Sequence, residues 1–189
     1  SPFENSLILT FDGVGEWSTT TIAEGNKNEI KLLREIKYPH SLGLLYSAFT
    51  YYLGFKVNSG EYKLMGLAPY GKPIYVDLIL NNLIDLKSDG SFRLNQKFFN
   101  YSEGLTMIND KFSNLFNKSI RKPGTDIDNT HMDIAASIQK VLEIIIIKIC
   151  KSLKNEYGYT NLCLAGGVAL NCVINGKLKD ENIFQNIWI

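Results

Sequence analysis

The sequence lacks the charge excess of a nucleic-acid-binding protein and the long apolar runs of a membrane protein. Its 189 residues contain 20 Lys and Arg and 19 Asp and Glu, so the net charge is +1. Binding to a phosphate backbone draws on many basic side chains, so we expect no nucleic-acid partner. The longest aliphatic run, residues 144–147, is far shorter than the about 20 apolar residues of a membrane-spanning helix, so we expect no membrane contact.

Cysteine is scarce, and the standard motifs of covalent catalysis are missing. Cys150, Cys163 and Cys172 form an odd set without metal-ligand spacing, and each stands among apolar residues. We therefore predict buried free thiols and a cytoplasmic location, where disulfides are rare. The sequence contains no Gly-x-Ser-x-Gly elbow, no glycine loop with a Walker lysine and no Cys/His pair for nucleophilic catalysis. If the chain is enzymatic, these absences favour non-covalent chemistry on a nucleotide.

The first part of the chain has the pattern of three antiparallel strands followed by a helix. An apolar run over residues 6–11, a threonine-rich run over residues 16–23 and an alternating run over residues 29–36 are separated by glycine turns. Ser41 is placed to cap the helix, and Gly54 is placed to stop it. This order predicts a meander of strands joined by tight turns.

Residues 74–130 are less regular and read as an insert. Asp89 and Gly90 predict a hairpin turn, whereas the polar residues 109–129 predict an excursion over the surface. Binding contacts come disproportionately from irregular loops of this kind. We therefore expect contacts with a substrate or with another domain within residues 86–129.

Residues 131–189 predict a helix, a strand, a glycine turn and a second helix in that order. Apolar residues recur every three or four positions up to Gly158, which is the period of an amphipathic helix. An apolar strand over residues 162–165 ends at a pair of glycines, and a helix over residues 169–179 and a strand over residues 183–189 follow. We therefore assign an α/β fold with mixed sheets and flanking helices.

Two strand ends carry candidate binding residues. Gly166 and Gly167 lie between a buried strand and a helix, where backbone N–H groups can approach a phosphate; a tight packing turn is the alternative. Asn171 falls in the first turn of the following helix and either contacts a base or ribose or bonds to the local backbone. Asp12 ends the first strand, where its carboxylate either binds a divalent metal or forms an Asx turn.

A second candidate group lies between the two ends of the chain. Glu61 and Lys63 stand two residues apart in a segment that a glycine precedes. The carboxylate is suited to ribose hydroxyls and the ammonium group to phosphate. An exposed charge pair without a ligand is the alternative.

Four motifs in this order resemble the O-carbamoyltransferase family, which includes the nodulation-factor and aminoglycoside-antibiotic enzymes. They are LTFDGVGEW at residues 9–17, PHSLGLLY at residues 39–46, NSGEYKLMGLAPYG at residues 58–71 and LAGGVALNC at residues 164–172. The resemblance covers essentially the whole chain, and four motifs together are more specific than any one of them. It implies a ribonuclease-H-like fold of the actin-like ATPase type, present here in part.

The resemblance also implies a reaction. Such enzymes use carbamoyl phosphate and ATP to form a carbamoyl-adenylate, which carbamoylates a substrate hydroxyl, and an iron-type divalent metal helps to polarise the transferred group. By motif, Asp12 is implied as a metal ligand. The residues implied in nucleotide binding are Glu61, Lys63, Gly166, Gly167 and Asn171.

The resemblance implies that the chain is a fragment of the family's N-terminal domain. The chain starts at Ser1 without a methionine or a signal peptide. The family's metal-binding histidine pair lies before this point, and a further acidic ligand and a YrdC-like domain lie after Ile189. We divide the fragment into the end of a first lobe (residues 1–73), an insert (residues 74–130) and the start of a second lobe (residues 131–189), and we expect it to be inactive by itself.

Two other functions compete with this one. A sugar- or acetate-kinase-like phosphotransferase of the same fold would carry a hydroxyl residue beside the glycines that follow Asp12, and this turn has none. A non-catalytic relative would keep the hydrophobic pattern but would not need Asp12, Glu61, Lys63 and the double glycine together. Their joint presence favours the enzyme.

Overall fold

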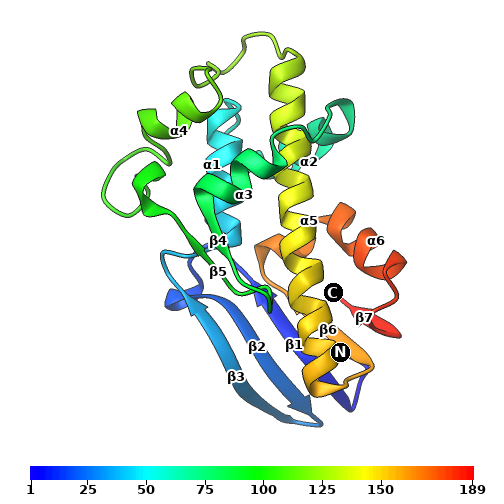
Figure 1. Cartoon of the computed structure of the whole chain (residues 1–189). Coiled ribbons are helices and arrows are strands. Elements are labelled where there is room, and N and C mark those ends of the chain that lie inside the picture. Colours follow the sequence, from blue (N-terminus) through cyan, green and yellow to red (C-terminus); the bar gives the residue numbers. More distant parts are fainter. The chain divides into compact units, whose positions relative to one another are not determined.

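A computed structural model describes residues 1–189 and resolves them into two compact units (Figure 1). The sheet unit consists of residues 1–44, 87–91 and 143–189, and the helical unit consists of residues 45–86 and 92–142. Two helices contribute residues to both units, namely α1 (Leu42–Tyr52) and α5 (Asn129–Tyr157).

A five-stranded sheet forms the centre of the sheet unit, in the order β3-β2-β1-β6-β7. Strands β1 (Asn5–Phe11), β2 (Ser18–Asn26) and β3 (Glu29–Lys37) pair antiparallel, which confirms the predicted meander. Strand β6 (Asn161–Ala165) pairs parallel with β1, and β7 (Asn186–Trp188) pairs parallel with β6. The sheet is therefore mixed, and the α/β class with a mixed sheet and flanking helices is confirmed.

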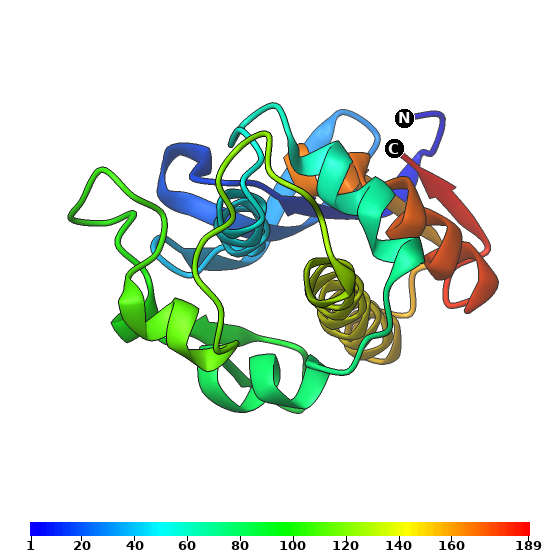
Figure 2. The ribbon, with the colours of Figure 1, turned by 90° about the horizontal axis from the view of Figure 1, so that it is seen from above.

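Strand β1 is central because it pairs with both β2 and β6, and the alternation of its side chains covers one of its faces. Leu7, Leu9 and Phe11 point to one side and are at most 1% exposed, as the period of two in a strand requires. The C-terminal part of α5 packs in the same unit, where an ion pair of 2.5 Å joins Arg34 of β3 to Glu156. Both chain termini lie in this unit and near one another in both views (Figure 1, Figure 2).

The second strand starts later than its sequence suggests. The prediction placed its start at Glu16, but residues Gly15–Trp17 form the 3-10 turn η1, and β2 begins at Ser18. Glu16 and Trp17 have φ values of 45° and 82°, a left-handed backbone that a strand does not accept. The prediction was wrong here because non-glycine residues seldom adopt this conformation.

The helix after β6 is also interrupted. The prediction was a single helix over residues 169–179, but the 3-10 helix η4 (Gly167–Leu170) is followed by a break at Asn171 and then by α6 (Cys172–Asp180). Asn171 has φ −73° and ψ 96°, which is extended rather than helical. It therefore precedes α6 as its N-cap and does not lie in its first turn.

The cysteines differ from one another in burial, and none forms a disulfide. Cys150 in α5 is buried, and burial raises the pKa of its thiol to about 12, so it stays protonated and unreactive. Cys163 is half-buried and Cys172 is exposed. The prediction of buried thiols is therefore right only for Cys150, because Cys172 opens α6 on its outer side.

Short helices and one pair of strands also belong to the helical unit. The helices are α2 (Glu61–Leu67), η2 (Ala68–Tyr70), α3 (Val76–Leu83), η3 (Gln96–Phe98) and α4 (Asp110–Leu115). Strands β4 (Ile84–Leu86) and β5 (Phe92–Leu94) pair antiparallel, which confirms the predicted hairpin. No helix in the structure combines the length and apolarity needed to cross a bilayer.

An aromatic cluster forms the core of the helical unit. Phe112 of α4 lies 5.0 Å from Phe49 and 5.4 Å from Tyr52 between ring centroids, and Phe116 joins the same cluster. Phe112 is fully buried and Phe116 is 5% exposed. The prediction of a surface excursion over residues 109–129 is therefore wrong in its first part, because two phenylalanines four residues apart give this polar stretch a buried helical face.

A reciprocal cap starts α5. The carboxylate of Asp128 accepts a hydrogen bond of 3.1 Å from the backbone N–H of His131, and Nδ1 of His131 accepts one of 3.1 Å from the backbone N–H of Asp128. This is a capping box with histidine in the third position. Because Nδ1 accepts, the imidazole is neutral in this arrangement. Nδ1 also lies 2.7 Å from the carboxylate, a contact that favours the protonated imidazole, but burial outweighs it and lowers the pKa of His131.

The lowered pKa of His131 predicts that the protein loses stability in mild acid. Below the unfolded value of 6.5 the unfolded chain binds a proton that the folded chain rejects, so the free energy of unfolding falls as the pH drops through about 6.5. Urea denaturation at pH 7.5 and pH 5.5 measures the change. His131→Gln keeps a capping side chain without the titration and should flatten the dependence. An equally steep dependence in this variant would contradict the assignment, since the pKa of Asp128 is lowered from 3.8 and acts in stronger acid.

Candidate functional site

The strands β1 and β6 end side by side at one edge of the sheet. Thr10 pairs with Ala165 in the parallel register, so the residues that follow both strands emerge together. Asp12 follows β1, and Gly166 and Gly167 follow β6. Oδ1 of Asp12 lies 3.7 Å from the point that a Cβ on Gly167 would occupy. The structure thus brings these residues together, as the sequence predicted, and not onto opposite surfaces.

The backbone of Asp12 is fixed, whereas its side chain is exposed. Its N–H donates to the carbonyl of Thr19 at 2.9 Å, and its own carbonyl accepts from the hydroxyl of Ser41 at 2.8 Å. Oδ1 accepts the N–H of Gly13 at 2.8 Å, which is the local turn contact. Oδ2 accepts no hydrogen bond. Asp12 therefore closes a turn with one oxygen and presents the other at the sheet edge.

Gly43 brings the start of α1 against Asp12. A Cβ on Gly43 would lie 2.8 Å from the carbonyl oxygen of Asp12 and 2.9 Å from the nitrogen of Gly13, both of which are backbone atoms. Ser41 completes the junction, because its hydroxyl accepts the N–H of Leu44 at 3.0 Å and so caps α1 as predicted. Sequence reasoning assigned Gly43 no role. The signal is a glycine in the first turn of a helix, where glycine is otherwise unfavourable.

The two glycines after β6 have different environments. Gly166 has φ +91°, and a Cβ on it would lie 2.2 Å from the carbonyl oxygen of Phe11, so this position accepts only glycine. Gly167 is exposed, and a Cβ on it would meet nothing closer than Oδ1 of Asp12. The packing alternative therefore describes Gly166, and the backbone of Gly167 is open to a ligand.

The beginning of η4 offers backbone donors at this edge. The N–H groups of Gly167 and Val168 start the 3-10 helix, where an N–H has no acceptor within the helix, and neither makes a hydrogen bond. Both are therefore available to an oxygen of a ligand. They lie beside the exposed carboxylate of Asp12, since Gly167 neighbours its Oδ1.

Asn171 contacts its own backbone surroundings. Its side-chain oxygen accepts the N–H of Ile174 at 3.2 Å and caps α6, and the residue is 8% exposed. Of the two predicted alternatives, the local hydrogen bond is the one present in the structure. The residue fixes the direction in which α6 leaves the turn.

Glu61 and Lys63 belong to the helical unit. Oε1 of Glu61 accepts from the hydroxyl of Ser47 at 2.8 Å and from the N–H of Asn58 at 2.9 Å, and Oε2 accepts from the N–H of Gly60 at 3.1 Å. Glu61 thereby ties the loop before α2 to α1. Lys63 is exposed, forms no ion pair and lies 6.0 Å from the ring centroid of Tyr62.

The chain contains only part of what a metal site needs. No three of its His, Cys, Asp and Glu side chains are grouped to hold an ion. The carboxylate of Asp12 is a suitable oxygen donor, but stable sites for divalent transition metals take three or four protein ligands. Residues 1–189 alone therefore do not fit an iron-type ion.

Comparison with known proteins connects this geometry to one family. The family described as carbamoyltransferase N-terminus matches residues 1–189. An uncharacterized protein of Synechocystis is 60% identical over the whole chain, which covers 31% of that protein. Over the whole chain, identity is 37% with nodulation protein NolNO of Sinorhizobium fredii and 35% with nodulation protein NolO of Bradyrhizobium diazoefficiens.

The chain spans only about a quarter to a third of the length of these relatives, since it covers 26% of NolNO and 32% of NolO. The family match nevertheless extends over every residue of the chain, and it includes all four motifs quoted above. The chain therefore belongs to the O-carbamoyltransferase family.

Proposed function

We propose that the protein carrying this chain is an ATP-dependent O-carbamoyltransferase. Water releases phosphate from carbamoyl phosphate, the resulting carbamate displaces pyrophosphate from ATP to give a carbamoyl-adenylate, and the hydroxyl group of a small-molecule acceptor takes the carbamoyl group and releases AMP. Family membership supports the carbamoyl transfer. The observation that carries the nucleotide part is the exposed Gly167, whose unpaired N–H group lies beside the carboxylate of Asp12.

The glycine turn is suited to a nucleotide for two reasons. Its two unpaired N–H groups, on Gly167 and Val168, can donate to phosphate or carbonyl oxygens. The missing side chain of Gly167 lets those oxygens approach the backbone closely. In this role Gly166 shapes the turn, and Asn171 holds α6 in place behind it.

Glu61 and Lys63 are proposed as further nucleotide contacts. A carboxylate has about four acceptor positions, so Glu61 can accept a ribose hydroxyl in addition to its three present donors. Lys63 has an exposed ammonium group without an ion pair, which is suited to a phosphate.

Asp12 is proposed as a ligand of an iron-type divalent metal. Such an ion would supply Lewis-acid polarisation of the carbamoyl group. Because residues 1–189 do not complete its ligand set, no step of the proposal runs through the metal.

The proposal extends to the fold family and to the rest of the protein. An antiparallel meander extended by parallel strands is compatible with a ribonuclease-H-like, actin-like ATPase fold. The chain covers 26–34% of its relatives, which leaves room for a YrdC-like partner domain in the full-length protein. We place the protein in the cytoplasm, where its substrates carbamoyl phosphate and ATP are formed.

The reaction is tested with the natural full-length protein, carbamoyl phosphate, ATP and ferrous ion. We expect AMP and pyrophosphate to form only when carbamoyl phosphate is present, and label from the carbamoyl carbon to reach an added hydroxyl compound. ADP and a phosphorylated acceptor would instead indicate a phosphotransferase. Residues 1–189 by themselves are expected to show no turnover.

A further inference from the structure

The helical unit contains an open pocket of about 850 Å³, of which the proposed function uses only Lys63. This volume lies within the range of small-molecule sites, about 300–1,000 Å³. The pocket is lined by the end of α1 and the loop that follows it, and by one residue of α2. Two stretches of the chain between β5 and α5, within residues 105–107 and 121–125, complete the lining. All of its lining residues belong to the helical unit.

Every charged side chain that lines the pocket is positive. Lys56 and Lys63 are exposed and form no ion pair, and Arg121 lies deeper, with 9% of its surface exposed. No aspartate or glutamate lines the pocket. Glu61, two residues before Lys63, accepts hydrogen bonds with both oxygens, from the hydroxyl of Ser47 in α1 and from backbone N–H groups of the loop before α2. The pocket therefore attracts anions, and its two lysines have no competing partner.

The remaining lining is largely apolar and aromatic. Phe55 and Val57 come from the loop after α1, and Leu105 and Met107 come from the insert. The side chain of Leu105 is fully exposed to solvent, so a ligand that covers it would remove apolar surface from water. An inorganic anion would leave these four side chains uncovered.

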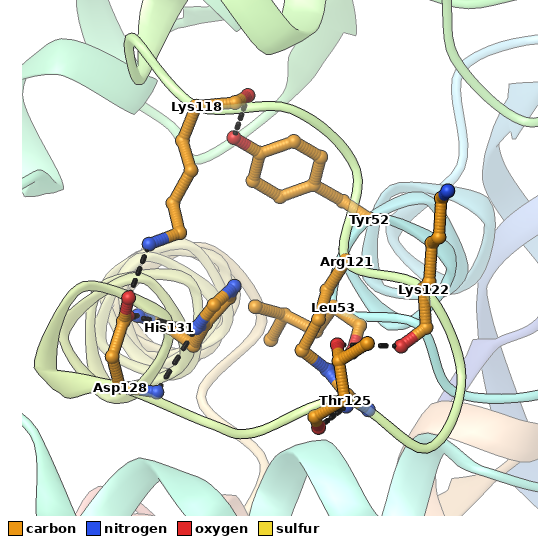
Figure 3. A network of polar contacts seen from close by, with 8 residues as sticks. All are labelled: Tyr52, Leu53, Lys118, Arg121, Lys122, Thr125, Asp128 and His131. Carbon is orange, nitrogen blue, oxygen red and sulfur yellow. Dashed lines mark hydrogen bonds and ion pairs between the residues drawn. The ribbon is translucent and has the colours of Figure 1, made fainter.

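Arg121 lines the pocket, and hydrogen bonds hold its side chain in place (Figure 3). Its Nε donates to the carbonyl of Leu53 at 2.6 Å, its Nη1 donates to the carbonyl of Thr125 at 2.5 Å, and its backbone N–H donates to the carbonyl of Tyr52 at 3.0 Å. Its guanidinium lies 5.2 Å from the ring centroid of Phe55. The carbonyl oxygens at the end of α1 therefore already accept hydrogen bonds from Arg121, so their partial negative charge does not repel an anion in the pocket.

We propose that this pocket binds an organic anion with an apolar body. The anionic group lies between the ammonium groups of Lys56 and Lys63, and the body lies against Phe55, Leu105 and Met107. The pocket shares Lys63 with the proposed nucleotide contacts, but the proposal rests on the charge and shape of the helical unit and does not depend on carbamoyl transfer.

Two fluorescent probes of nearly the same shape test the proposal on the natural full-length protein. Anilinonaphthalene sulfonate carries an anionic group on an aromatic body, and phenylnaphthylamine has the body alone. We expect the sulfonate to bind saturably at one site and at least about tenfold more tightly than the neutral probe. Lys56→Glu should weaken the sulfonate roughly tenfold. Lys111→Glu makes the same charge change at an exposed lysine of α4 outside the pocket and should change the affinity less than twofold.

Displacement of the sulfonate then identifies the source of the anion. AMP combines a phosphate with an aromatic base, and octanoate combines a carboxylate with an alkyl chain. Displacement of the probe by either compound supports the proposal and identifies the class of ligand.

Leu105→Ser should lower the affinity for the sulfonate probe several-fold without changing the thermal transition. Equal affinity of the charged and neutral probes, equal effects of the two lysine variants, or no displacement by either compound would each overturn the proposal.

Discussion

Asp12→Asn in the natural full-length protein is expected to lower the rate of carbamoyl transfer by at least about 100-fold, the usual effect of removing one essential electrostatic group from an active site. The carboxylate is exposed at the edge where β1 and β6 end, and one of its oxygens makes no hydrogen bond. Asparagine has the same shape but carries no charge. The rate of transfer from labelled carbamoyl phosphate to an acceptor hydroxyl is the measurement.

We expect the fold to tolerate Asp12→Asn, so a loss of transfer rate would report on the carboxylate and not on unfolding. The contacts of Asp12 with Thr19 and Ser41 use backbone atoms, and the amide oxygen of asparagine can still accept the N–H of Gly13. The matched control is Asp180→Asn, at an exposed aspartate at the end of α6, for which we expect wild-type transfer. Transfer at the wild-type rate in Asp12→Asn would remove this residue from the reaction.

The regular elements could be predicted from the sequence because each shows its own period. Apolar residues recur at every second position along β1 and at every third or fourth position along α5. Each pattern predicts its element from the local sequence alone. The structure departs from prediction where the cause is not local. Glu16 and Trp17 adopt left-handed conformations that nothing in their residue types announces, and Phe112 is buried only because it packs on Phe49 of another helix.

The candidate site likewise has features that follow from the local sequence and features that depend on residues distant in the sequence. Asp12 and Gly167 each follow a short apolar strand, and strands that run parallel bring their ends to one edge, so their proximity could be predicted. The close approach of Gly43 to Asp12 depends on where α1 begins in space, and the sequence carries no period or spacing for it. The N-cap position of Asn171 was missed because the 3-10 turn before it has the composition of a helix.

Gly167→Val in the natural full-length protein is expected to weaken the binding of a non-hydrolysable ATP analogue by about 10- to 100-fold, the equivalent of one hydrogen bond to a charged group. The new side chain would occupy the space through which a ligand reaches the N–H groups of Gly167 and Val168. Apart from its chain neighbours, Oδ1 of Asp12, at 3.7 Å, is the only atom within 4 Å of the Cβ position of Gly167, so we expect a thermal transition close to that of the wild type. Calorimetric titration together with thermal unfolding measures both quantities.

Gly166→Ala provides the contrast that separates a binding role from a packing role. A Cβ there would lie 2.2 Å from the carbonyl oxygen of Phe11, at a φ of +91° that alanine rarely adopts, so we expect a loss of stability of about 3 kcal/mol or more. If the double glycine served only packing, Gly167→Val would leave the affinity for the analogue unchanged. If the glycine turn binds the nucleotide, Gly167→Val loses affinity while it keeps its stability, and Gly166→Ala loses stability at every ligand concentration. The two neighbouring glycines therefore distinguish an adenylate-binding turn from a structural one, because only Gly166 is held against β1 and only Gly167 faces open space.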